Sequence, residues 1–97
     1  MPLRSVFKST FQKAYDRLSR ENQLLILKAL EALTVYFQTG QAPYGLHIKK
    51  LHAGGPSRIF EARVSADLRL AWVQTQDEAV FSLLGSHDEV QKFLKNL

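Results

Sequence analysis

The sequence contains no cysteine, one methionine and three prolines among its 97 residues. Without cysteine, neither a disulfide framework nor a cysteine-ligated zinc site can form. No apolar run approaches the roughly 20 residues that a membrane-spanning helix requires. The first residues, MPLRSVFKSTFQK, alternate apolar and polar side chains and lack the apolar core of a secretory signal. These absences favour a soluble protein of a reducing compartment, and we expect it in the cytoplasm.

The composition that remains is that of a small globular domain. Hydrophobic residues make up 45% of the chain and charged residues 23%, which is typical of a folded rather than a disordered protein. Thirteen Lys and Arg residues against nine Asp and Glu residues give a formal net charge of +4. This excess indicates, weakly, an acidic partner such as nucleic acid or an acidic protein. We expect one domain that spans residues 1–97.

Hydrophobic spacing divides the chain near residue 46, where a helical period gives way to a strand period of 2. The predicted elements are a strand over 3–8, helices over 9–18 and about 19–39, strands over 46–52, 58–65, 68–75 and 79–84, and a final helix opened by Ser86. Consecutive strands joined by short turns favour an antiparallel sheet with helices packed on it. The prediction is therefore an α+β fold of order β-α-α-β-β-β-β-α, with about four to five strands, a two-helix N-terminal hairpin and a C-terminal helix.

Local signals predict where the helices begin and end. The sequences STFQ at 9–12 and SHDE at 86–89 have capping-box spacing, in which the first and fourth side chains each bond the other's backbone N–H. Ser19 is expected to cap the second helix, and Gly40 to end it in a left-handed conformation.

Alternation in the strand over 58–65 assigns its residues to two faces. Phe60, Ala62 and Val64 are expected to face the core, because they share one side of the strand. Glu61 and Arg63 lie on the other side, away from that core. Trp72, in the next strand, is expected to be a core residue.

Four segments, taken in order, resemble the RelE/ParE superfamily of toxins from type II toxin–antitoxin systems. They are GLHIKKL at 45–51, IFEARV at 59–64, DLRLAW at 67–72 and LLGSHDEV at 83–90. The superfamily includes ribosome-dependent mRNA endonucleases and toxins that inhibit DNA gyrase. The resemblance implies an antitoxin protein as partner, ribosome and mRNA as targets, and no cofactor, metal or membrane.

The resemblance also implies roles for particular residues. RNA cleavage by the 2′-oxygen needs a base, a group that neutralises the charged phosphorane, and an acid for the leaving oxygen. Arg63 and Arg69 would bind the scissile phosphate, because Arg forks match phosphate oxygens. His87 would act as general acid or base, and Glu61 would be the other member of that pair.

Two lysines complete the predicted site, and one tyrosine that several family members carry is missing from the sequence. Lys49 and Lys50 would position the RNA backbone. The tyrosine that several family nucleases carry near the C-terminus is absent, and Gln91 and Phe93 occupy that region. The leading interpretation is therefore a RelE-like mRNA interferase, and the alternative is a ParE-like gyrase inhibitor or a catalytically silent protein-binding module.

The same residues also admit purely structural interpretations. Arg69 can pair with Glu61 or Asp67 on a solvated face, and the two lysines can be simple surface charges. His47 and His52 lie five residues apart on a predicted strand, so their side chains face opposite sides and make a poor metal pair.

Overall fold

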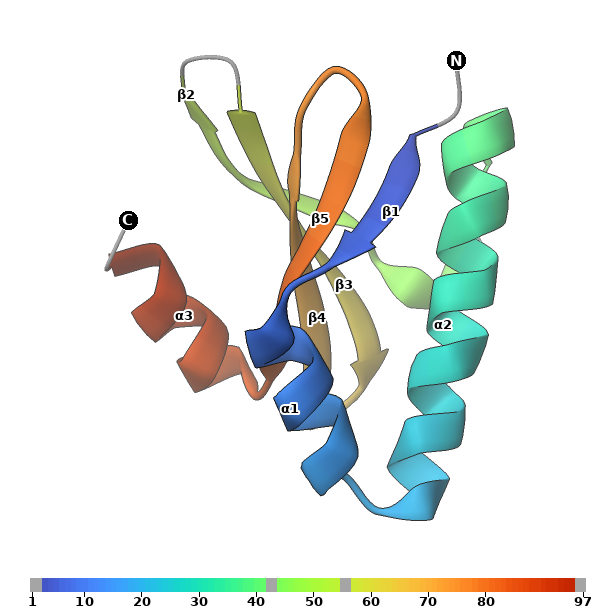
Figure 1. Cartoon of the computed structure of the whole chain (residues 1–97), viewed down its shortest axis with the longest axis vertical. Helices are drawn as coiled ribbons and strands as arrows, with labels where there is room; N and C mark the ends of the chain where they lie inside the picture. Colours follow the sequence, from blue (N-terminus) through green and yellow to red (C-terminus); the bar gives the residue numbers. More distant parts are fainter. Residues whose placement is uncertain (1–2, 42–43, 55–56, 96–97) are drawn as a thin grey trace.

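The computed structural model describes residues 3–41, 44–54 and 57–95. Its elements, in chain order, are β1 (Arg4–Phe7), α1 (Ser9–Arg17), α2 (Arg20–Thr39), a 3-10 turn (Tyr44–Leu46), β2 (Lys49–Gly54), β3 (Ser57–Ser65), β4 (Leu68–Gln74), β5 (Glu78–Gly85) and α3 (His87–Lys95). A twisted sheet lies between α3 and the α1–α2 hairpin (Figure 1). The α+β class and the element order predicted from the sequence are confirmed.

The described strands form one sheet in the order β1-β5-β4-β3-β2. The pairs β2–β3, β3–β4 and β4–β5 are antiparallel, as predicted for strands joined by short connections. The sheet is mixed because β1 adds to β5 in parallel. At this edge the Arg4 guanidinium donates a hydrogen bond to the Glu78 carboxylate, and that bond, together with the charge of Glu78, raises the pKa of Arg4.

The helix boundaries confirm three of the four local signals. Ser19 Oγ accepts a hydrogen bond from the Asn22 N–H at 3.2 Å. Gly40 ends α2 with φ of 80°, a conformation that favours glycine. In the box at 86–89, the Ser86 N–H donates to Glu89 Oε1 at 3.0 Å and the Glu89 N–H donates to Ser86 Oγ at 3.2 Å.

The capping box predicted at 9–12 is wrong. Lys8 is the N-cap of α1 and its side chain makes no cap bond, so Ser9 is already helical. The reason lies in the sheet, because the Lys8 N–H donates to the Phe81 carbonyl at 3.0 Å. This bond fixes the chain in an extended conformation at Lys8, and the helix starts one residue earlier than the local pattern indicates.

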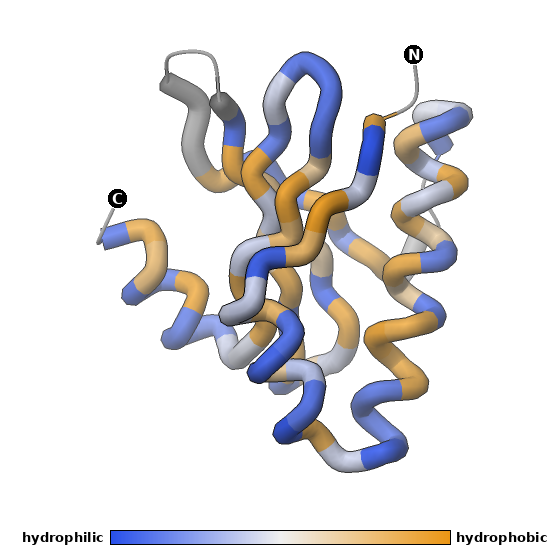
Figure 2. Tube along the Cα trace, in the orientation of Figure 1, coloured by the Kyte–Doolittle hydropathy of each residue, from blue (hydrophilic) through white to orange (hydrophobic). Residues whose placement is uncertain are grey.

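The main core lies between the sheet and the α1–α2 hairpin. Trp72 is fully buried, as predicted, and its ring lies 5.6 Å from Phe37, 5.6 Å from Phe60 and 5.9 Å from Phe81. Its indole N–H donates to Gln74 Oε1 at 3.2 Å. Figure 2 shows apolar positions along α2 and in the central strands, with a hydrophilic β4–β5 hairpin tip. Burial of these aromatic rings removes a large apolar surface from water, which stabilises the fold.

A second, smaller core lies under α3, on the opposite face of the sheet. Val90 is fully buried, Ala71 is fully buried and Ile59 is 4% exposed, and none of the three belongs to the main cluster. Helix α3 contacts β4 and β5 on this face. The face assigned to Glu61 from the sequence is therefore covered, and Glu61 itself is only 3% exposed.

The strand expected to begin at Leu46 begins later. Leu46 is the last residue of the 3-10 turn, and His47 adopts a left-handed backbone with φ of 44°. A strand needs negative φ, so β2 starts at Lys49. In the turn predicted at 53–57, residues 55–56 lie outside the described part of the chain. None of the described helices is long and apolar enough to cross a membrane.

Candidate functional site

Two arginines face each other across β3 and β4. Arg63 and Arg69 are directly paired in the antiparallel register, which brings Cβ atoms to about 4.5–5.5 Å. Arg63 is exposed, and the Arg69 side chain is 20% exposed. Like charges directly opposite each other are destabilising in a sheet. A bound anion relieves this repulsion, and two guanidinium groups together match the oxygens of a phosphate.

Glu61 compensates one of these charges. Its Oε2 lies 3.9 Å from Nη1 of Arg69, which is ion-pair distance but too long for a hydrogen bond. The Glu61 Oε1 and Arg69 Nε atoms are buried without a hydrogen-bond partner among the described residues. An ion pair with Glu61 was one of the two structural interpretations of Arg69, and the structure contains this pair. The pair was expected on a solvated face, but Glu61 is buried. Arg63 has no ion-pair partner in the part of the chain that the structure describes.

The sheet separates the two lysines that the sequence analysis grouped together. Lys49 is paired with Glu61 and Lys50 with Phe60, so the two lie on opposite faces. Both are exposed. Only Lys49 shares the face of the arginine pair, and Lys50 belongs to the side of the main core.

His87 is the first residue of α3, as expected, and is exposed. It follows by two residues Gly85, which is paired with Arg69 across β4 and β5. The N-terminus of a helix favours anions through its free N–H groups and its dipole. Asp88 and Glu89 in the first turn oppose this attraction.

Gly85 has a packing role that the sequence analysis did not single out. A Cβ atom at this position would lie 2.8 Å from Oε1 of Glu89, the oxygen that accepts from the Ser86 N–H. Glycine at this position therefore leaves room for the Glu89 carboxylate that caps α3. Gly85 is also the residue that pairs with Arg69 across β4 and β5. A glycine immediately before a capping box is the signal that identifies such a position.

Metal binding has little support in the described residues, which contain no group of three or more His, Asp or Glu side chains that could hold an ion. His47 is exposed and precedes β2, so it does not lie on a strand as expected. The side chain of His52 lies outside the described part.

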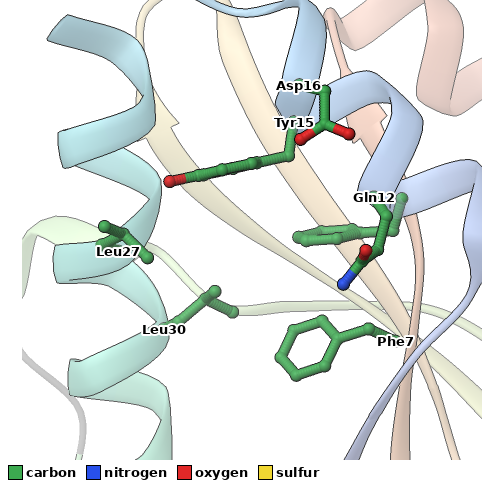
Figure 3. A pocket seen from close by; sticks show the side chains of 7 residues that line it. Phe7, Gln12, Tyr15, Asp16, Leu27 and Leu30 are labelled. Atoms are coloured by element: carbon green, nitrogen blue, oxygen red, sulfur yellow. The ribbon is translucent and has the colours of Figure 1, made fainter. Parts of the chain in front are cut away.

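A separate hollow of about 350 Å³ lies between β1, α1 and α2. Its lining is largely apolar and consists of Phe7, Phe11, Gln12, Tyr15, Asp16, Leu27 and Leu30. Figure 3 shows Tyr15 reaching from α1 towards α2, with Leu27 and Leu30 approaching from the other side. None of the lining residues is cationic, so this hollow does not share the chemistry of the arginine pair.

The chain has the RelE-like toxin fold, since it superposes on several solved structures of such toxins over about nine tenths of its length. The archaeal RelE–RelB complex from Pyrococcus horikoshii OT3 matches with a TM-score of 0.70 and 16% identity, covering 89% of this chain and 96% of the other.

Two further solved toxin structures have the same fold. A copper-bound mutant toxin from Helicobacter pylori matches with a TM-score of 0.63 and 23% identity, covering 91% of this chain and 98% of that one. The Escherichia coli DinJ–YafQ complex matches with a TM-score of 0.61 and 22% identity, covering 91% and 97%. No protein-family model matches the sequence, and no curated protein matches it. At these identities the likeness establishes the fold.

Proposed function

We propose that this chain is the toxin of a type II toxin–antitoxin pair, a metal-independent endoribonuclease that cuts mRNA on the ribosome in the cytoplasm. The observation that supports this proposal most strongly is the cross-strand pair of Arg63 and Arg69. Two adjacent guanidinium groups, with a single carboxylate beside them, favour binding of a phosphate. The solved RelE–RelB and DinJ–YafQ complexes support a protein antitoxin as partner.

In the proposed reaction, the 2′-oxygen attacks the adjacent phosphorus and the 5′-oxygen leaves. Arg63 and Arg69 stabilise the charge that develops on the phosphorane. His87 transfers a proton as general acid or base, and Lys49 contacts the RNA backbone on the same face. Lys50, on the other face, contacts a more distant part of the RNA.

Glu61 has two roles to be separated. It is either the second proton-transfer group or the carboxylate that orients Arg69, and its burial with the 3.9 Å ion pair favours orientation. A Glu61→Gln variant distinguishes the roles. Loss of cleavage with unchanged RNA affinity identifies a base, whereas a change in RNA affinity identifies an orienting group.

The test of the function is controlled expression with mapping of mRNA 5′ ends. We expect growth arrest with new cuts in phase with codons. Arg63→Ala/Arg69→Ala and His87→Ala should abolish both, with folding checked by circular dichroism. Arrest and cleavage that persist in Arg69→Ala and His87→Ala would overturn the assignment.

A second candidate is a protein-binding toxin such as a gyrase inhibitor, or a silent member of the fold. The observation in its favour is the apolar surface of α2, where Leu24 is 55% exposed, Leu27 49% and Val35 49%. Growth arrest without RNA cuts, accompanied by inhibition of supercoiling in vitro, would select the gyrase inhibitor. Harmless accumulation of folded protein would select the silent module.

A further inference from the structure

Helix α2 has an outer face that the described part of the chain leaves exposed. Figure 1 shows α2 along one edge of the molecule, with no other element outside it. Exposed residues on this face recur in alternating steps of three and four, which is the a and d pattern of a coiled coil. They are Glu21, Leu24, Lys28, Glu31, Val35 and Gln38. The outer face, defined by these six residues, therefore has the spacing of a seam for another helix.

The outer face is complementary to itself when two copies of it meet antiparallel. A two-fold axis that passes between residues 29 and 30 places Lys28 of each copy beside Glu31 of the other. The same axis places Leu24 of each copy beside Val35 of the other, and these two residues are 55% and 49% exposed in the single chain. Each contact occurs twice, because a two-fold interface uses the same patch on both copies. One arrangement thus pairs the opposite charges and covers the exposed apolar side chains together.

A hollow on the outer face has the shape that this contact needs. It measures about 370 Å³ and is lined by Lys28, Glu31, Ala32 and Val35. Residues spaced i, i+3, i+4 and i+7 on a helix surround a hole that accepts one side chain of a facing helix. Ala32 is small, and the Glu31 carboxylate borders the hole. Lys28 of the second copy can therefore bury its carbon stem in the hollow and place its ammonium group on Glu31.

The charges of the outer face select one orientation and one register. Neither Lys28 nor Glu31 has an ion-pair partner among the residues that the structure describes, so both are available to a second copy. In a parallel pair each would meet its own equivalent, and like charges repel. An antiparallel pair shifted by one heptad would bring Glu21 against Glu31, and the opposite shift would bring Glu31 against Val35. Charged side chains in a seam specify the register in this way, at some cost in stability.

We propose that a second copy of this chain covers the outer face, through an antiparallel α2–α2 seam in a two-fold symmetric dimer. The inference is independent of the proposed function, because it uses neither the arginine pair nor RNA. Two helices of 20 residues that touch along one stripe bury less than the roughly 1,600 Å² of a standard interface. We therefore expect a dimer in exchange with the monomer, and its population should rise with protein concentration.

The test is sedimentation velocity of the full chain over a concentration series, which separates the 11.0 kDa monomer from a species of twice that mass. Lys28→Glu and Glu31→Lys should each weaken self-association by at least about tenfold, because each places two like-charged pairs in the seam. The double variant Lys28→Glu/Glu31→Lys should restore self-association, since the exchanged charges match again. An equimolar mixture of the two single variants should form a mixed dimer. Both variants keep a positive net charge, so attraction between them arises at the seam.

Lys92→Glu is the matched control, because it makes the same change of charge at an exposed position of α3. Its self-association should change less than about twofold, since charges far from the seam are screened by salt. A monomer at every concentration up to about 1 mM would overturn the dimer and leave the outer face to a partner of other chemistry. Equal weakening by Lys92→Glu and Lys28→Glu, or no rescue in the double variant, would overturn the seam. Thermal unfolding checks that each variant is folded.

Disulfide formation provides a second measurement, because the chain has no cysteine of its own. Under mild oxidation, Leu24→Cys mixed with Val35→Cys should form a mixed covalent dimer. Leu24→Cys alone should not, because its two copies lie about 16 Å apart along the antiparallel seam, beyond the reach of a disulfide. Covalent dimers of Leu24→Cys with itself, without the mixed species, would indicate a parallel contact and overturn the proposal.

Discussion

The two faces of the sheet differ in what they bury. The face under α1 and α2 is closed by an aromatic cluster around Trp72, and neither of the two buried side-chain atoms found without a hydrogen bond in the described residues belongs to that cluster. The face under α3 buries Ile59 and Val90 beside a carboxylate and a guanidinium that are incompletely bonded. A loosely satisfied polar pair costs stability. The comparison indicates that the first face supplies stability, and the second face retains charges that a binding site needs.

The largest effect is expected on the aromatic face. Trp72→Ala removes a fully buried side chain and leaves a cavity, and should lower the free energy of unfolding by about 3–5 kcal/mol. That is a large share of the roughly 5–15 kcal/mol of a typical domain. Urea denaturation measures it, with exposed Val35→Ala as control. A loss in Trp72→Ala below about 1 kcal/mol would show that this face is not the principal core.

On the charged face, removal of one partner of the Glu61–Arg69 pair should cost more stability than removal of both partners. Arg69→Met leaves the buried Glu61 carboxylate without its counter-charge and should cost about 3 kcal/mol. This figure is at the low end of the range for buried pairs, because the atoms are 3.9 Å apart. Adding Glu61→Leu should recover most of that loss, since an apolar pair of similar volume replaces an ion pair at little cost.

The same urea unfolding measurements, arranged as a double-mutant cycle, test this coupling. If the double variant loses as much as the two single variants added together, Glu61 and Arg69 do not interact. The two faces would then differ in composition, but the charged face would not be stabilised by coupling between Glu61 and Arg69.

The smallest effect is expected where the charged face meets α3. Gly85→Ala pushes a methyl group against the Glu89 carboxylate, which can swing away at the expense of the capping box. The expected loss is about 1 kcal/mol, the usual value of one helix cap. In a Glu89→Ala background, Gly85→Ala should add almost nothing. Thermal unfolding of the unmodified chain, the two single variants and the double variant measures this. If the two losses of stability add fully, Gly85 does not act through the Glu89 cap.

Features that depend on a few neighbouring residues were predictable from the sequence. The Ser19 cap, the left-handed Gly40 and the box at 86–89 all arise within four residues of chain. Burial of Trp72 followed from strand alternation. The strands of Arg63 and Arg69 follow one another in the predicted antiparallel sheet, and this order brings the two arginines opposite each other.

Features set by distant segments were not predictable in this way. The burial of Glu61 was not expected, because strand alternation assigns a residue to one face of the sheet but does not tell whether another segment covers that face. The start of α1 depends on a ladder bond from Lys8 to Phe81, more than 70 residues away. The separation of Lys49 from Lys50, by contrast, follows from alternation within the predicted strand, and only the register with β3 decides that Lys49 is the one on the face of the arginine pair.

The place of Arg63 has an evolutionary consequence. One residue is both the strand partner of Arg69 and part of the lining of a hollow between α2 and β3. A substitution there alters both surfaces at once, so neither can drift independently at this position. Leu24, which is exposed and belongs to neither the arginine pair nor the lining of that hollow, is free to vary as far as these two surfaces are concerned. Among descendants of this chain, we expect Arg63 to persist while its neighbours adapt around it.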